Sequence, residues 1–172
     1  TLVELVNKTR EISTLFNIRD LVNYCATNNL YEVNAFSFDG YVAPILTFDD
    51  FTKVSMDLLS YENRKQLFKE DWPIYTTSHK TPPAMYMEGA RVKNSFIANG
   101  SIINGKVENS ILSRDVIVEE GAEVKNSIIF THTKVGAKVK LNYVLADKHA
   151  EIKQVKRLSG EKDEVLVVRQ GA

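Results

Sequence analysis

The sequence is poor in features that define several large classes of protein. It has one cysteine, Cys25, so no disulfide can form within the chain. No stretch approaches the roughly 18 consecutive apolar residues that a membrane-spanning helix requires. These two absences predict a chain without a membrane anchor, in a reducing, cytoplasmic setting.

The chain also has no excess of either charge. Lysine and arginine together number 22, and aspartate and glutamate together also number 22. A neutral chain produces no overall field that would attract a polyanion or an acidic membrane. We therefore expect no nucleic acid and no membrane among its partners.

What the sequence does have is a phrase that recurs in its second half. VKNSFI begins at Val92, VENSIL at Val107 and VKNSII at Val124, and a degenerate copy, LNYVLA, begins at Leu141. The intervals between these starting positions are nearly equal, and the last two are identical. Similarity at a nearly fixed period indicates a repeat architecture, in which each unit stacks on the next.

Within each copy, apolar residues return at steps of five or six residues. One set is almost entirely Val, Ile or Leu: Val92, Ile97, Ile103, Val107, Leu112, Val118, Val124, Ile129, Val135, Leu141, Ala146, Ile152 and Leu158. A second set, four residues further on, is small or apolar: Phe96, Ser101, Ile111, Val116, Ala122, Ile128, Thr133, Val139, Leu145 and Ala150. We expect both sets to point inward.

Neither a helix nor a simple strand has this period. The pattern predicts a solenoid of short parallel strands with three faces per coil, in which about four coils share one core. A β-sandwich of regularly spaced strands is the alternative. A sandwich, however, gives no reason for a phrase of the sequence to repeat at so regular an interval.

The first half of the sequence predicts helices and one strand. A helix is expected over 18–27, with Asn17 as its cap, and a strand over 30–38, where side chains alternate loosely. Thr47 and Asp50 have the spacing of a capping box at the start of a further helix. This mixture is typical of an α/β domain.

A proline-rich segment separates the two halves. Residues 71–83 hold three of the four prolines, which favours an extended linker. We therefore expect residues 1–85 to form an α/β portion with its linker, and residues 86–172 to form the solenoid. The β-branched run at 165–168 is expected to be a closing strand that covers an edge.

Three segments carry a resemblance to a known family. They are FDDFTKVSMDLL over 48–59, DWPIYT over 71–76 and PPA over 82–84, and the solenoid pattern follows them. Together they resemble the C-terminal half of bacterial ADP-glucose pyrophosphorylases, the glucose-1-phosphate adenylyltransferases of glycogen synthesis. The resemblance implies the C-terminal part of a Rossmann-like nucleotidyltransferase domain, joined to a left-handed parallel β-helix. The family's reaction converts ATP and glucose 1-phosphate to ADP-glucose and pyrophosphate with the help of Mg²⁺.

Two departures from the family's pattern bear on catalysis. The Gly-rich phosphate loop and the sugar-phosphate lysine motif are absent from these residues. Pro44 stands at the position of the family's metal-binding aspartate, and Leu46 replaces a glycine. A proline side chain has no oxygen to offer a hard divalent cation. The sequence therefore assigns no catalytic, metal or cofactor-binding residue and no cofactor to this chain.

With these departures, the chain resembles the family's non-catalytic sister subunit. The resemblance implies a fragment of a regulatory subunit that works through assembly with a catalytic ADP-glucose pyrophosphorylase subunit, as a hetero- or homo-oligomer. Trp72 and Tyr75 of the DWPIYT segment are expected to pack at the interface between the two halves.

A hexapeptide-repeat acyltransferase that uses CoA is the alternative. Such an enzyme would use a solenoid histidine as its base. His132 and His149 each lie three residues after an inward position, so we expect both to face solvent, and their spacing identifies no partner carboxylate. His79 lies in the proline-rich linker. A third possibility is a pure interaction module, in which the faces and the open end of the solenoid serve only assembly with other proteins.

Overall fold

A computed structural model describes residues 3–4, 6–7 and 17–171 of the chain. Internal contacts divide it into two compact units, residues 1–39 and residues 40–172, and each is described by itself. Among the described residues, no helix combines the length and the hydrophobicity needed to cross a bilayer.

The first unit contains the helix expected after Asn17. Helix α2 spans Ile18–Thr27 and buries Leu21 and Cys25, which lie four residues apart on one face. Asn17 occupies the N-cap position, but its side chain donates to the Asp20 carboxylate at 3.3 Å instead of capping the backbone. The predicted helix is therefore confirmed, while the predicted cap interaction is not.

The strand predicted over 30–38 is wrong. This segment is irregular, and its apolar side chains, including that of Phe36, are exposed. None of the sheets formed by the described residues includes this segment. Because a strand is stabilised by hydrogen bonds and side-chain contacts with a neighbour, alternation alone does not produce one here.

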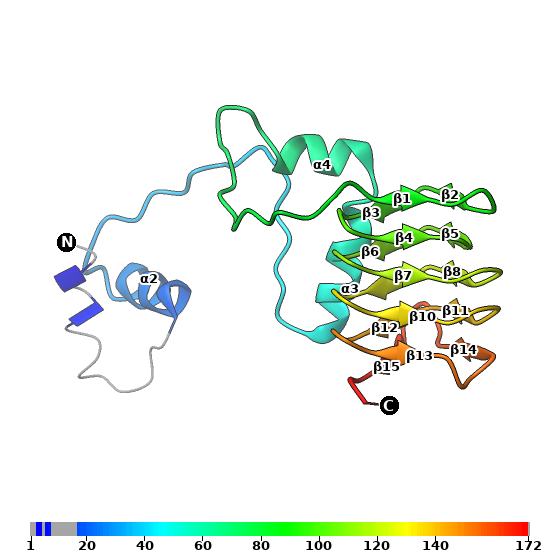
Figure 1. Cartoon of the computed structure of the whole chain (residues 1–172). Coiled ribbons are helices and arrows are strands. Elements are labelled where there is room, and N and C mark those ends of the chain that lie inside the picture. Colours follow the sequence, from blue (N-terminus) through cyan, green and yellow to red (C-terminus); the bar gives the residue numbers. More distant parts are fainter. Residues whose placement is uncertain (1–2, 5, 8–16, 172) are drawn as a thin grey trace. The chain divides into compact units, whose positions relative to one another are not determined.

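The second unit is built around a three-sided parallel β-helix (Figure 1). The first sheet has the order β1-β4-β7-β10-β13, the second β14-β11-β8-β5-β2 and the third β15-β12-β9-β6-β3, and every pairing is parallel. The strands are β1 (Met85–Tyr86), β2 (Arg91–Lys93), β3 (Phe96–Ile97), β4 (Ile102–Ile103), β5 (Lys106–Glu108), β6 (Ile111–Leu112), β7 (Ile117–Val118), β8 (Glu123–Lys125), β9 (Ile128–Ile129), β10 (Lys134–Val135), β11 (Lys140–Asn142), β12 (Val144–Ala146), β13 (Glu151–Ile152), β14 (Arg157–Ser159) and β15 (Leu166–Val168). The solenoid predicted from the repeat is confirmed, and its three-sided section agrees with the left-handed β-helix that the family resemblance implies.

The first predicted set of inward residues forms the core. Val107, Val124 and Leu141 stack in register on consecutive coils, and each is at most 1% exposed. Only the ends of this set are more open, as at Val92, which is 38% exposed because no further coil covers it. Each coil thus buries its inner face against the next, as a solenoid requires.

The recurring Asn-Ser pair forms one corner of the coils. Asn109 and Asn126 have positive φ values of 46° and 48°, a left-handed conformation that asparagine tolerates better than most residues. The serine that follows joins adjacent coils: the Ser110 hydroxyl accepts the Ser127 N–H at 3.1 Å, and the Ser127 hydroxyl accepts the Val144 N–H at 3.0 Å. We call Ser95, Ser110 and Ser127 the serine column. The repeated phrase therefore encodes both the turn and the bonds between turns.

The second predicted inward set is only partly correct. Ile128 and Leu145 are buried, but their strand neighbours Ile129 and Ala146 belong to the core cluster. Since successive side chains of a strand point to opposite faces, Ile128 and Leu145 lie on the outer face of the third sheet. A helix covers this face, and so the expectation that they point inward is wrong.

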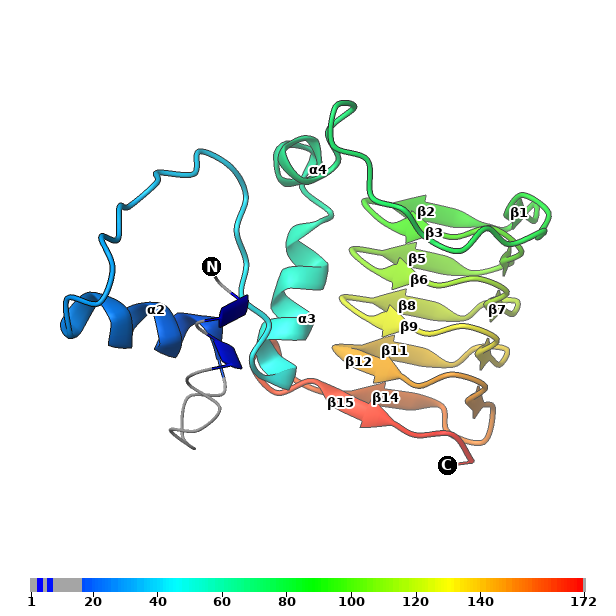
Figure 2. The same ribbon diagram turned by 90° about the vertical axis from the view of Figure 1, so that its left-hand side faces the viewer.

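That covering helix is α3 (Phe48–Asp57), which runs alongside the third sheet across several coils (Figure 2). Its predicted capping box is present: the Asp50 N–H donates to Thr47 Oγ1 at 3.1 Å, and the Thr47 N–H donates to the Asp50 carboxylate at 2.9 Å. The Phe51 ring lies 6.1 Å, centroid to centroid, from the ring of Phe130, which directly follows β9. The capping box fixes where the helix begins, and these ring contacts help to hold it on the sheet.

Helix α4 (Tyr61–Leu67) follows and is attached through one arginine. Arg64 Nη1 donates to the carbonyl oxygens of Leu58 and Leu59 at 3.1 and 2.9 Å, which are groups left free at the end of α3. The same guanidinium lies 4.9 Å from the centre of the Phe96 ring on β3. Arg64 thus links both helices to the first coil.

The last coil is longer than the others. The path along the chain from Val144 to its partner Leu166 is longer than the path from Ile128 to its partner Leu145, one coil earlier. The extra residues form the loop 160–165, whose ends are tied to the preceding coil by Gly160 N–H to Asn142 O at 2.9 Å and Leu166 N–H to Tyr143 O at 3.0 Å. The apolar run at 165–168 thus contributes β15, which extends the third sheet by one parallel strand.

Candidate functional site

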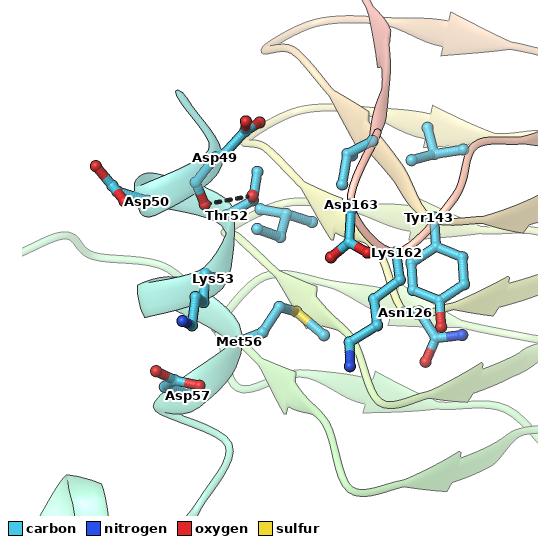
Figure 3. A pocket seen from close by; sticks show the side chains of 13 residues that line it. Asp49, Asp50, Thr52, Lys53, Met56, Asp57, Asn126, Tyr143, Lys162 and Asp163 are labelled. Carbon is cyan, nitrogen blue, oxygen red and sulfur yellow. Dashed lines mark hydrogen bonds between the residues drawn. The ribbon is translucent and has the colours of Figure 1, made fainter. Parts of the chain in front are cut away.

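A cavity of about 620 Å³ lies between α3, the outer face of the third sheet and the loop 160–165 (Figure 3). Its lining residues come from segments far apart in the sequence: Asp49, Asp50, Thr52, Lys53, Met56, Asp57, Asn126, Ile128, Tyr143, Val144, Lys162, Asp163 and Val165. The volume lies within the range of small-molecule binding sites. We treat it as the candidate functional site and call it the α3 cavity.

The helix places its polar residues on the cavity by their spacing. Asp49, Lys53 and Asp57 are four residues apart and therefore share one face of α3. Between them, the buried Thr52 hydroxyl donates to the Asp49 carbonyl at 2.9 Å, so it is already satisfied within the helix. Opposite the helix, Lys162 and Asp163 reach the cavity from the loop.

The floor and the corner of the cavity come from the β-helix. Ile128, on the outer face of the third sheet, supplies an apolar surface, and Tyr143 stands at the Asn-Ser corner with a φ of 52°. Asn126, one coil away, donates to Asn142 Oδ1 at 2.9 Å. The cavity thus combines an apolar floor with polar groups at its rim, an arrangement that can hold an amphipathic ligand through hydrogen bonds and one aromatic contact.

Two groups beside the cavity have shifted pKa values. The side-chain hydrogen bond with Thr47, followed by the backbone N–H groups of Leu46 and Thr47, lowers the pKa of Asp50, which stays ionised as part of the helix cap. Burial raises the pKa of Tyr41, and the negative charge of Asp57 raises it further. The Tyr41 hydroxyl is buried without a hydrogen-bond partner among the described residues. Tyr41 therefore keeps its proton.

The lining chemistry suits the binding of a polar ligand. Its charged groups are carboxylates and lysines, such as Asp57, Asp163 and Lys162, and the Tyr143 side chain lies among them. These groups can pair with charges or hydrogen-bonding groups of a ligand that rests on the apolar floor. The sequence predicted the helical wall of the cavity through the capping box at Thr47 and Asp50, but it did not predict the opposite wall, because the position of the loop 160–165 depends on the fold.

The histidines predicted to face solvent do so at another corner. His132 and His149 stack with ring centroids 4.9 Å apart, and both have a φ of 59°. Asp115 lies below them in the same column, with Oδ2 3.7 Å from His132 Nδ1. Sequence spacing did not identify this carboxylate, yet Asp115 precedes His132 by one coil, just as His132 precedes His149. The coil period was the signal that would have found it.

Other residues singled out in the sequence lie away from the cavity. Pro44 is exposed in the irregular segment before Thr47, and His79 is exposed in the irregular segment before β1. Trp72 and Tyr75 are 69% and 91% exposed, so the expectation that they pack at an interface is not met. Trp72 closes a tight turn with Lys69, to whose carbonyl its N–H donates at 3.3 Å, and Tyr75 lies in the irregular segment that follows.

Comparisons with known proteins agree with this architecture. The family described as GlmU-like, C-terminal hexapeptide, matches residues 82–164. Glycogen biosynthesis protein GlgD of Bacillus subtilis (strain 168) is 36% identical over 136 residues, which cover 79% of this chain and 40% of that protein. Glucose-1-phosphate adenylyltransferase of Bacillus cereus (strain Q1) is 32% identical over 142 residues, covering 81% of this chain and 38% of that enzyme.

The fold and the match over 82–164 define a hexapeptide-repeat β-helix protein. The similarity to GlgD and to glucose-1-phosphate adenylyltransferases over this region confirms the family resemblance found in the sequence. The chain spans about two fifths of the length of these two relatives.

Proposed function

We propose that this chain belongs to a non-catalytic subunit that assembles with a catalytic glucose-1-phosphate adenylyltransferase subunit and modulates it. The observation that carries the proposal is Pro44, which stands where the family resemblance places a metal-binding aspartate. The similarity to GlgD, a protein named for glycogen biosynthesis, supports the pathway. In this proposal the family's Mg²⁺ and ATP are handled by the partner and not by this chain.

The second unit has the physical properties that an assembly role needs. Its core is a continuous stack formed mainly by Val, Ile and Leu side chains. Helix α3 packs on the outside of this stack, and Arg64 of α4 contacts both the end of α3 and the Phe96 ring of the first coil. A surface carried by such a scaffold keeps its shape when a partner binds, which limits the entropy lost on association. We infer that the β-helix presents contact surfaces while the chemistry occurs elsewhere in the assembly.

The test uses the full-length protein and the catalytic subunit of the same organism. ADP-glucose formation is measured for each protein alone and for the mixture, and the mass of the mixture is determined by light scattering after size-exclusion chromatography. We expect no activity from this protein alone, a mixed oligomer, and altered kinetics of the catalytic subunit. Substantial activity alone, or failure of the two proteins to associate, would overturn the proposal.

One observation favours a second candidate, a CoA-dependent acyltransferase. The 3.7 Å approach of Asp115 to His132 is the kind of contact that orients a histidine base. His132 is, however, half exposed and stacked on His149, so its ring is not enclosed by a substrate site. Titration of acetyl-CoA into wild-type protein and into a His132→Asn variant, followed by calorimetry, separates the two functions. Binding that is lost in the variant would favour the acyltransferase.

A further inference from the structure

The outer face of the second sheet carries an excess of positive charge. Side chains at the outward positions of β2, β5, β8, β11 and β14 form two columns in register. We call this surface the basic face; its charged members are Arg91, Lys106, Glu123, Lys140 and Arg157 in the first column and Lys93, Glu108 and Lys125 in the second. With six cations against two carboxylates, its net charge is +4 in a chain that is neutral overall.

Part of this charge is balanced within the face. Glu123 lies 3.9 Å from the Lys106 ammonium and 3.2 Å from that of Lys140. Glu108 likewise lies 3.5 Å from Lys93 and 3.8 Å from Lys125. Each carboxylate thus sits between two lysines on neighbouring strands, and each group of three keeps one positive charge.

The ends of the first column break this alternation. Arg91 pairs in register with Lys106, and Lys140 pairs in register with Arg157, so like charges stand side by side on strands about 4.8 Å apart. Among the described residues neither arginine forms an ion pair. Like charges directly opposite one another destabilise a sheet, so the fold itself gains nothing from these two pairs.

The upper part of the basic face is also hollowed. A depression of about 260 Å³ is lined by Arg91, Lys93, Lys106 and Lys125, with Glu108 as its one carboxylate and the strands of Val92 and Val107 beneath. Four cations therefore surround a space that is open to solvent. A ligand with several negative groups would relieve the repulsion between Arg91 and Lys106.

The layout of the charges selects the kind of ligand. Side chains on a sheet stand roughly parallel to one another, so cations spread over five strands do not converge on a single small anion. The first column extends over about 19 Å, which is four strand spacings. An acidic polypeptide segment carries carboxylates over a comparable length. The face also lacks the aromatic side chains on which the bases of single-stranded nucleic acid stack.

We propose that the basic face is a docking site for an acidic segment of a partner protein. The segment lies along the columns, and its carboxylates pair with Arg91 and Lys106 and with Lys140 and Arg157. This inference goes beyond the proposed function and does not depend on it, because it rests on the charges of the basic face and is tested by peptide binding, whereas the proposed function rests on Pro44 and is tested by ADP-glucose formation and oligomer mass. Its failure would therefore leave the proposed assembly with a catalytic subunit untouched.

The test measures binding of a fluorescently labelled oligoglutamate peptide to the full chain by anisotropy. We expect saturable binding at about 20 mM NaCl that weakens at least about tenfold at about 300 mM, because exposed charges are screened. An Arg91→Gln/Lys106→Gln variant should bind roughly fivefold more weakly, as expected for the loss of two exposed ion pairs. The matched control, Lys65→Gln/Lys148→Gln, removes the same charge from exposed positions outside the basic face and should bind as wild type does.

A second variant and two competitors complete the test. Lys140→Gln/Arg157→Gln removes the other like-charged pair and should also weaken binding. It replaces the first variant in the test if that variant has a lowered melting temperature. Absence of saturable binding, or equal weakening in the control, would overturn the proposal. Tighter binding of a single-stranded oligonucleotide than of the peptide would overturn it in favour of nucleic acid. Full displacement by inorganic pyrophosphate at equal charge concentration would overturn it in favour of a small anion.

Discussion

Replacing Ser127 with alanine tests whether the serine column holds the coils together. The Ser127 hydroxyl accepts the Val144 N–H at 3.0 Å and donates to the Lys125 carbonyl. Ser127 is 1% exposed and Val144 is fully buried. In Ser127→Ala, water cannot reach the Val144 N–H, which loses its acceptor.

The expected cost follows from the two groups left behind. A buried donor without a partner costs about 1–3 kcal/mol. The Lys125 carbonyl adds little, because it still accepts the Tyr143 N–H at 3.2 Å. For a chain of this size, a loss of about 1–3 kcal/mol lowers the melting temperature by roughly 2–12 °C.

The assay is thermal unfolding followed by circular dichroism, with urea unfolding as a second measure. Ser159→Ala is the matched control, because the Ser159 hydroxyl is exposed and reaches only the Gly160 carbonyl at 3.3 Å. This control should change stability by less than about 0.5 kcal/mol. If Ser127→Ala melts within a degree of Ser159→Ala, the hydroxyl is not what joins the coils.

Three further predictions concern the core, the helix cap and the helix anchor. Val124→Asp places a carboxylate among fully buried side chains and should cost about 4 kcal/mol or more, whereas Lys125→Asp on the exposed face should cost less than about 1 kcal/mol. Equal melting temperatures of the two variants would contradict the assignment of Val124 to the core and Lys125 to the surface. The lowered pKa of Asp50 means that its contribution is present above the ordinary value of 3.8 and is lost as pH falls through the lower folded value, so acid titration of α3 should show this loss in wild type and not in Asp50→Asn. Arg64→Ala removes two hydrogen bonds to the end of α3 and the contact with β3, so hydrogen exchange in α4 should accelerate, while Lys65→Ala should leave it unchanged.

The sequence predicted the β-helix well because its main signal is local and repeated. Val107, Val124 and Leu141 occupy one role in successive copies, and the coil period alone placed them in one stack. Ile128 shows where this logic stops. An apolar residue on a strand can face the core or a covering helix, and the repeat contains no information on which of these buries it. Ile128 faces outward because α3 covers the third sheet.

The candidate site was much less predictable. Its two walls are α3 and the loop 160–165, which lie far apart in the sequence and have no shared motif. The Asp115–His132 contact was accessible in principle, because the coil period connects the two residues. The failed strand at 30–38 has the opposite cause: alternation is a weak signal unless a neighbouring strand is available.

The enlarged last coil allows the shape of the α3 cavity to change independently of the stability of the β-helix. Residues are added only between β14 and β15, and both strands still pair in register with β11 and β12. Substitutions or insertions in the loop 160–165 would thus reshape one wall of the α3 cavity while leaving the stack intact. Ligand preference at this position can evolve, or be engineered, at little risk to folding.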